Sequence, residues 1–180
     1  MKAEKYYKKA VKVWSSMLQR CYDNKVHNQE QTYIGCQVCD EWLNFSLFYS
    51  WFKDNYYELP CESIQLDKDI IVKNNKLYSP ERCCFVPHTI NSLFTKNNKN
   101  RGTTPIGVSW IKRDKVYRAQ CNDGYKNRVG LGDYHDPITA FKVYKDYKEK
   151  IIKEIADKYK VVLKTKTYQA LYKYEVEITD

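Results

Sequence analysis

Long hydrophobic runs are missing from this chain of 180 residues. No apolar stretch approaches the roughly eighteen residues that a membrane-spanning helix needs. The first ten residues, MKAEKYYKKA, also lack the apolar segment of a secretory signal peptide. We therefore expect a cytosolic protein, and the length allows one domain or two small ones with an ordinary core.

A second spaced pair of cysteines, which a zinc ribbon normally has, is also missing. The chain has seven cysteines, and in a cytosolic protein this odd number indicates thiols or a metal site rather than disulfides. The spacing Cys36-x-x-Cys39, followed by the adjacent Cys83 and Cys84, leaves a tetrahedral zinc site open. Adjacent cysteines chelate one ion poorly, so we favour buried thiols that act as small apolar side chains.

Negative charge falls well short of positive charge in the second half of the chain. Residues 1–95 hold 12 Lys and Arg against 11 Asp and Glu, whereas residues 96–180 hold 19 against 11. Nearly all of the net charge of +9 therefore lies after residue 95. A basic segment of this kind attracts polyanions, and counterion release from phosphates is the usual source of affinity for nucleic acid. The alternative is a basic surface that serves solubility alone.

Apolar and aromatic residues recur at helical spacing in two segments of the first half. The first stripe is Tyr7, Val11, Trp14, Leu18 and Cys21, and the second is Trp42, Phe45, Phe48 or Tyr49, and Phe52. This period predicts an amphipathic helix over the first two dozen residues and another over about 40–54, packed on each other. The polar residues 23–35 between them have no period and predict a loop.

The segment after Pro60 predicts a strand, a turn and a helix in that order. LDKDIIV (66–72) has strand composition and NNK (74–76) is typical of a turn. Ser79 and Pro80 predict a helix start, with the serine as cap and the proline in the first turn. CCFVP (83–87) has β character and weakens the prediction of this helix, which resumes after Pro87.

A polar segment, TKNNKNRGTT (95–104), coincides with the change in charge. We place the domain boundary there. The predicted organisation is a first domain over residues 1–95, a linker over 96–104, a second domain over 105–160 and an extension over 161–180.

Three strand-like runs at 105–111, 115–121 and 127–134 follow the linker, and a helix is expected over about 136–159. Because strand side chains alternate, the second run turns Tyr117, Ala119 and Cys121 toward the helix and Arg118 and Gln120 away from it.

The extension is harder to place. Tyr172, Tyr174, Val176 and Ile178 alternate as in a strand, without an evident partner strand. It either docks on the body of the protein or mediates self-association.

Three fragments of the first half resemble the HNH-type homing endonucleases of phages and mobile elements. They are VWSSMLQRCYD (13–23), VCDEWLNFSLF (38–48), and LDKDI (66–70) with the following NNKLYSPERCCFVPHTIN (74–91). The resemblance implies a ββα-metal finger, in which an Asp-His pair stands beside a metal ion and the histidine takes a proton from the attacking water.

The pair in this chain is Asp67-Lys68, so the usual base is missing. A hydrated lysine is protonated at neutral pH and accepts no proton. Asp67 and Asp69, with Asn74, Asn75 or Asn91, stay candidate ligands for Mg²⁺, because hard cations prefer oxygen. His88 is either a substitute for the missing base, acting with Asp67, or, as we favour, an exposed histidine. We expect a degenerate, inactive finger.

The second half is similar to the AP2 DNA-binding domain that accompanies such endonucleases. The matching fragments are GVSWIKRDKVYRAQ (107–120), GLGDY (130–134) and DPITAFKVY (136–144). The resemblance implies an α+β fold in which a three-stranded antiparallel sheet enters the DNA major groove and one helix braces it from behind. Arg118, Gln120 and Arg128 would reach bases or phosphates, and the backbone would be positioned by Lys112, Arg113, Lys115 and Lys126. Trp110 is either a stacking residue or, as we favour, core.

Three functions are compatible with these features. The favoured one is a double-stranded DNA-binding protein in the cytoplasm of a bacterial host, of homing-endonuclease descent and without nuclease activity. A second is an anti-CRISPR protein that inhibits a Cas9-type nuclease, since the chain faintly resembles anti-CRISPR proteins on an AP2-type scaffold and tyrosine, present 17 times, is favoured in protein interfaces. The third is an active, metal-dependent DNA nickase that uses Asp67 with His88.

Overall fold

A computed structural model describes residues 2–95, 103–125, 127–178 and 180 of the chain. The chain divides into two compact units, residues 1–87 and 88–180. This division places the helix that begins at His88 in the second unit. Most of the predicted linker, residues 96–102, lies outside the described residues.

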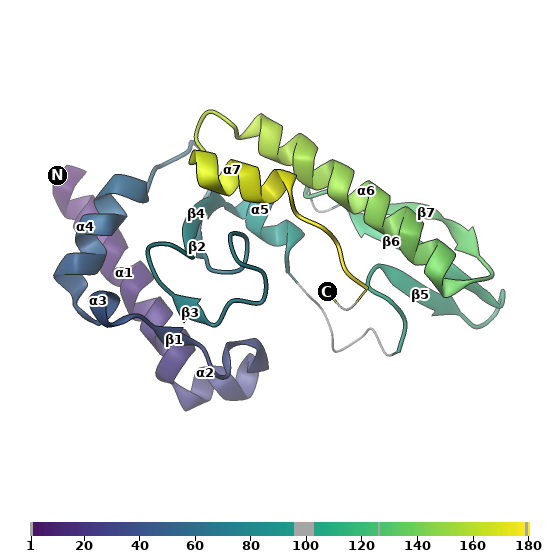
Figure 1. The fold of residues 1–180 in the computed structure, drawn as a ribbon, viewed down its shortest axis with the longest axis horizontal. Coiled ribbons are helices and arrows are strands. Elements are labelled where there is room, and N and C mark those ends of the chain that lie inside the picture. Colours follow the sequence, from purple (N-terminus) through teal and green to yellow (C-terminus); the bar gives the residue numbers. More distant parts are fainter. Residues whose placement is uncertain (1, 96–102, 126, 179) are drawn as a thin grey trace. The chain divides into compact units, whose positions relative to one another are not determined.

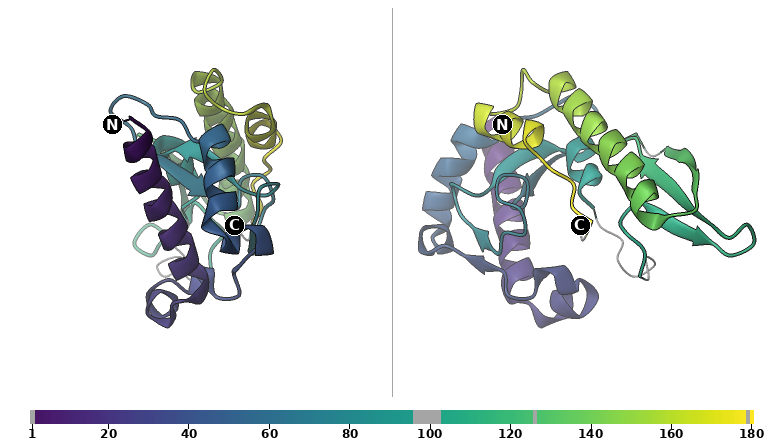
Figure 2. Two further views of the ribbon diagram at one scale, coloured as in Figure 1. Left: turned by 90° about the vertical axis from the view of Figure 1, so that its left-hand side faces the viewer. Right: turned by 45° about the vertical axis from the view of Figure 1, so that its right-hand side comes forward.

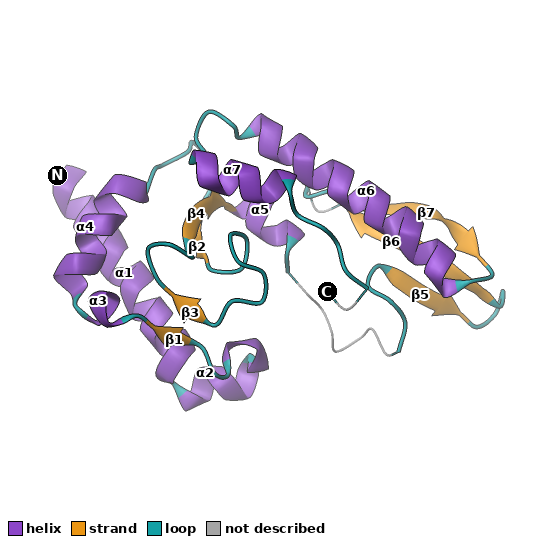
Figure 3. Cartoon of the chain, in the orientation of Figure 1, coloured by secondary structure: helices purple, strands orange, loops and turns teal. Residues whose placement is uncertain are grey.

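The first unit joins helices to short strands (Figures 1 and 3). Its elements are α1 (Lys2–Tyr22), α2 (Asn24–Gln29), η1 (Gln31–Tyr33), β1 (Gln37–Val38), α3 (Asp40–Leu43), α4 (Phe45–Asn55), β2 (Ile64–Asp67), β3 (Leu77–Tyr78) and β4 (Cys84–Pro87). β1 pairs with β3 in parallel, and β2 pairs with β4 antiparallel.

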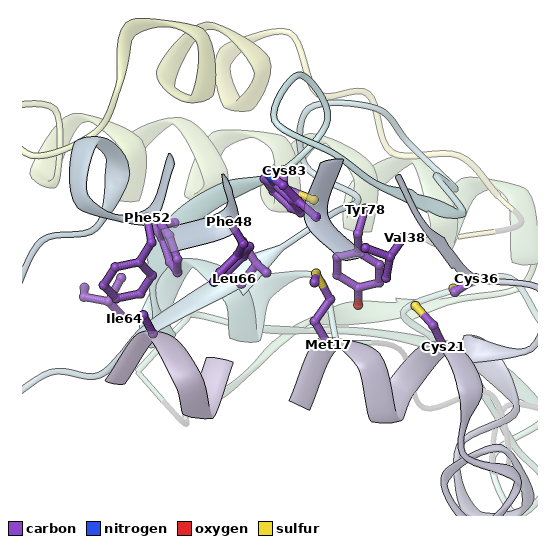
Figure 4. Packing of buried hydrophobic residues seen from close by; sticks show 13 residues of the cluster. Met17, Cys21, Cys36, Val38, Phe48, Phe52, Ile64, Leu66, Tyr78 and Cys83 are labelled. Atoms are coloured by element: carbon purple, nitrogen blue, oxygen red, sulfur yellow. The ribbon is translucent and has the colours of Figure 1, made fainter. Parts of the chain in front are cut away.

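The core of the first unit forms between α1, α4 and the strands, as Figure 4 shows for Met17, Phe48 and Tyr78. The predicted contact of the two helices is confirmed, because Trp14 on α1 meets the Phe45 ring at 5.3 Å. Its indole N–H also donates to the Trp42 carbonyl at 2.7 Å. The buried positions of α1 include Ala10, Met17 and Cys21, so the predicted stripe is rotated and its members Tyr7 and Val11 are exposed.

Three local predictions for the first unit are wrong. The strand expected over residues 66–72 is not formed over that range, because β2 ends at Asp67. Residues 23–35 are not a plain loop, because the Asp23 carboxylate accepts a hydrogen bond from the Lys25 N–H and caps α2. No helix begins at Ser79, where a turn leads into β4. The residues of β4 are buried throughout and pair with β2, and this non-local pairing outweighs the local helix signals.

The second unit is an α+β unit in which an antiparallel sheet packs against one long helix, as predicted (Figures 1 and 2). Its elements are α5 (His88–Leu93), β5 (Val108–Ile111), β6 (Val116–Asn122), β7 (Arg128–Tyr134), α6 (Pro137–Lys158) and α7 (Thr165–Tyr172). The strand order is β5-β6-β7, so β6 is the central strand.

Helix α6 begins where the sequence predicts and buries an apolar face that includes Phe141, Tyr144 and Ile155. The Asp136 carboxylate accepts from the Thr139 N–H at 2.7 Å and caps the helix, and Pro137 follows in the first turn. Lys148 lies buried on the apolar face, and burial lowers the pKa of its ammonium group. α5 and α7 pack against the same helix.

The predicted strand in the extension is wrong. Residues 165–172 form α7, and residues 174–177 run without regular structure. Val176 is buried in the core between sheet and helix. Its N–H donates to the Glu149 carboxylate at 2.8 Å and its carbonyl accepts from Lys145 Nζ at 2.9 Å. The side chains of α6 thus supply the partners that a neighbouring strand would have supplied.

None of the helices in the described parts of the chain is long and apolar enough to span a membrane.

Candidate functional site

Lys68, which stands where the resemblance places the catalytic histidine, is buried directly after β2. Its Nζ donates to both carboxylate oxygens of Asp69, at 2.8 and 2.7 Å, and to the Asn75 carbonyl at 2.7 Å. An ammonium group has three N–H donors and no acceptor. All three donors are therefore used, and Lys68 ties the strand end to the loop that follows.

Asn75 closes this loop from the other side. Its Nδ2 donates to the Lys68 carbonyl at 2.9 Å and to the Leu77 carbonyl at 2.7 Å. Its Oδ1 accepts from the Leu77 N–H at 3.1 Å and from Arg82 Nη1 at 3.2 Å. The side chain is buried and its polar atoms are engaged within the loop. The neighbouring Asn74 is exposed in the left-handed region, with φ of 57°.

Asp67, the other half of the predicted catalytic pair, faces into the same loop. Its Oδ1 accepts from the Asp69 and Ile70 N–H groups, both at 2.8 Å. Burial raises the pKa of this carboxyl to about 6, with the nearby Asp69 charge acting in the same direction, while the backbone hydrogen bonds and Lys68 oppose the rise. The carboxylate serves as the turn acceptor after β2.

The candidate metal ligands are divided between the two units of the chain. Among the described residues, no group of three or more His, Cys, Asp or Glu side chains is placed to hold a metal ion. Asp67 and Asp69 belong to the first unit, and Asn91 and the exposed His88 lie on α5 of the second. Both oxygens of Asp69 are already engaged by Lys68.

The four cysteines of the possible zinc site lie in the first unit as free thiols. Cys36, Cys83 and Cys84 are buried and Cys39 is half-buried. Burial raises the pKa of Cys39 and of Cys83. Cys36 and Cys83 belong to the apolar core.

The central strand β6 carries the predicted DNA-contacting residues in the predicted orientation. Ala119 and Cys121 are buried in the core under α6, and Tyr117 packs at its edge. Since successive strand side chains alternate, Arg118 and Gln120 lie on the opposite face. The face of the sheet that α6 does not cover is therefore polar at its centre.

Two carboxylates share this region with the predicted basic residues. Arg118 donates from Nε and Nη2 to the two oxygens of Asp133 on β7, at 2.7 and 2.7 Å. In the β5–β6 turn, Arg113 makes the same bidentate contact with Asp114, at 2.7 and 3.0 Å. The hydrogen bond from Arg118 lowers the pKa of Asp133. Both arginines are therefore charge-paired.

The other predicted contacts lie around the sheet. Lys112 and Lys115 are exposed in the β5–β6 turn, and Arg128 is exposed at the start of β7. Lys126 lies outside the described residues. The favoured core position of Trp110 is wrong, because its side chain is 45% exposed and its ring meets the Tyr117 ring at 4.7 Å.

Strand alternation alone could not place Asp133 on the same face of the sheet as Arg128, because β7 contains a bulge. Arg128 and Asp133 are five positions apart, so strict alternation puts them on opposite faces. The pairing of β6 with β7 shifts register between Ala119 and Gln120, leaving Leu131 without a partner on β6. The bulge turns both charged residues away from α6. The glycines on either side of Leu131 are the sequence signal that was available.

A scan against models of protein families, a search of curated proteins and a search of solved structures each found no match for this chain.

Proposed function

We propose that this protein binds double-stranded DNA through the face of the β5–β6–β7 sheet that α6 leaves uncovered. It descends from a phage or mobile-element homing endonuclease, its second unit is an AP2-like module, and its degenerate HNH-like segment has a structural role. The observation that carries the proposal is the side-chain arrangement on β6, where Arg118 and Gln120 lie opposite the buried Ala119 and Cys121.

Groove dimensions and charge support this assignment. The major groove of B-DNA admits a β-ribbon, and arginine and glutamine have side chains that pair with base edges there. The exposed Lys112, Lys115 and Arg128 flank the sheet at its turn and third strand. They would meet phosphates, which supply most of the affinity of such complexes. The excess of positive charge after residue 95 favours the same partner.

The absence of hydrolysis follows from how Lys68 is bound. A general base needs a free lone pair, and Lys68 Nζ instead donates hydrogen bonds to Asp69 and to the Asn75 carbonyl. Asp67 accepts two backbone hydrogen bonds that hold the turn after β2. These contacts support a loop that is kept for stability rather than for chemistry.

The test is a mobility-shift assay combined with a cleavage assay on supercoiled plasmid. We expect a shift of a random-sequence duplex that is equal in Mg²⁺ and in EDTA and that weakens steeply with salt. The plasmid stays supercoiled with Mg²⁺ or Mn²⁺ present. Absence of a shift at low salt contradicts the DNA-binding function. Metal-dependent nicking that disappears in an Asp67→Ala variant contradicts the structural role of the degenerate segment.

A further inference from the structure

We propose that Asp133 is a positioning residue that holds Arg118 for bidentate recognition of a guanine edge in the major groove. The proposal rests on the proposed function and goes beyond it, because it assigns a base preference to one position of the sheet and a role to a carboxylate that repels DNA phosphates. It starts from the paired guanidinium on the uncovered face.

The guanidinium is bound along one edge only. Nε and Nη2 each donate to one Asp133 oxygen, and these two donors form the side-on edge of arginine. Both N–H groups of Nη1 and the second N–H of Nη2 point away from that edge. One N–H of Nη1 and the second N–H of Nη2 form the end-on pair of donors, which has the spacing of O6 and N7 of guanine. The contact with Asp133 therefore leaves the guanine-binding donors available.

The backbone fixes the direction of this edge. Arg118 lies on the central strand, directly opposite Ser109 of β5 on one side and Asp133 of β7 on the other. The bulge at Leu131 brings Asp133 to this face, and Gly132 within it has φ of +116°, where a Cβ would lie 2.9 Å from the Tyr134 hydroxyl. The local backbone thus requires glycine to keep the pair in register.

The ion pair with Asp133 also changes whether Arg118 binds a phosphate or a base edge more favourably. The Arg118–Asp133 pair carries no net charge, so it contributes little to phosphate attraction, and the Asp133 carboxylate repels a nearby phosphate. A guanine edge carries only partial charges and is repelled far less. A carboxylate at this position therefore turns the arginine from a phosphate contact into a base contact.

Space beside the pair is sufficient for a base edge. The neighbours of Arg118 and Gln120 on the flanking strands are Ser109, with a small side chain, and Gly130, with none. A Cβ built on Gly130 would meet nothing within 4 Å. The pair itself stays partly accessible, with side-chain exposures of 37% for Arg118 and 38% for Asp133.

The experiment is selection of bound sites from a randomised duplex pool by the full chain, followed by affinity measurements on one selected duplex. We expect one invariant guanine, whose replacement by 7-deazaguanine or by adenine weakens binding by roughly 5- to 150-fold, the discrimination typical of a bidentate contact. Asp133→Asn should reduce that ratio several-fold. The same variant should bind unselected duplex more tightly, with a log–log salt slope steeper by about 0.9 for one new phosphate contact.

Asp114→Asn is the matched control, because it frees an arginine from the same bidentate contact in the exposed turn. It should raise general affinity and leave the guanine preference unchanged. Arg118→Met should abolish the preference, because methionine keeps a long side chain but has no donor for the guanine edge.

The outcomes separate this proposal from the function on which it rests. Duplex binding without a guanine preference, or a preference that Asp133→Asn leaves intact, overturns the positioning role alone. Failure of the full chain to bind any duplex overturns the DNA-binding function. A preference that Arg118→Met retains assigns the guanine to another residue and overturns the proposal as well.

Discussion

At the scale of single residues, polar side chains of this protein act mainly through the partners that the fold gives them. Lys68 appears in the sequence as a defective catalytic position, yet its ammonium group joins Asp69 to the Asn75 carbonyl. Arg118 appears as a free cation, yet it is paired with Asp133. The type of residue indicates which interactions are possible, and its neighbours in the fold determine which of them it makes.

Replacement of Lys68 by methionine tests its structural role. The substitution keeps the length of the side chain and leaves the Asp69 carboxylate and the Asn75 carbonyl without their donor. We expect a loss of about 1–3 kcal/mol in the free energy of unfolding, measured with urea. Lys25→Met, at an exposed position of α2, should change it by less than about 0.5 kcal/mol. Equal losses in the free energy of unfolding of the two variants would contradict a structural role specific to Lys68.

Asp67 predicts a pH dependence of stability. Its pKa in the folded chain is raised to about 6 from an ordinary value of 3.8, so the fold favours the protonated form. The contribution of this group to stability is complete below the unfolded pKa and is lost as the pH rises through the folded pKa. In urea unfolding from about pH 4 to pH 7, the stability of the wild type should therefore fall relative to Asp67→Asn.

Asp136 is the matched comparison for this pH series. Hydrogen bonds from Thr139 lower the pKa of Asp136, so its contribution is lost as the pH falls. The wild type should lose stability relative to Asp136→Asn toward acid pH, the opposite direction to Asp67. The same direction for both variants would contradict the raised pKa of Asp67.

At the scale of elements, local signals succeeded where contacts are local. The three strands after residue 104 alternate and are separated by turns, and α6 has a cap, a first-turn proline and an apolar stripe, so each is specified by its own residues. β4 and the segment after α7 are specified by distant partners. β4 pairs with β2, and Val176 bonds to side chains of α6.

The segment after α7 allows a prediction about stability at the scale of elements. Val176 is 3% exposed and Ile178 is 42% exposed, although a regular strand would place both on one face. Val176→Asp should lower the melting temperature markedly, through a loss of about 2–4 kcal/mol, because it buries a charge in the core. Ile178→Asp should have nearly no effect in the same melting experiment. Similar losses of stability at both positions would contradict the irregular backbone of this segment and support the strand that the sequence predicts.

At the scale of the whole molecule, charge is distributed unequally along the chain. Residues 1–95 are nearly balanced, and residues 96–180 carry almost all of the excess. Within the second unit, the carboxylates of Asp114 and Asp133 neutralise two arginines near the sheet. In the proposed DNA complex, phosphate attraction would therefore come from other cations of this unit, among them the exposed Lys112 and Arg128.

Two double variants, one in each unit, each remove two positive charges and test whether the position of the charge matters. Lys112→Gln with Arg128→Gln should weaken binding to a random-sequence duplex and reduce the salt slope by about 0.9 for each phosphate that is no longer neutralised. Lys12→Gln with Lys25→Gln removes the same charge from exposed positions of the first unit. It should leave the slope nearly unchanged in the same salt titration. Equal effects would mean that only net charge matters.

The sequence by itself determined the α+β class of the second unit, the three strands, the long helix and the faces of β6. These follow from periodicity, caps and alternation, which act between residues close in the chain. The tertiary structure alone decided the strand at β4, the docking of Val176 and the face on which Asp133 lies. Each depends on a pairing between distant residues or on the β7 bulge, and one shifted residue is enough to reverse the face of a side chain.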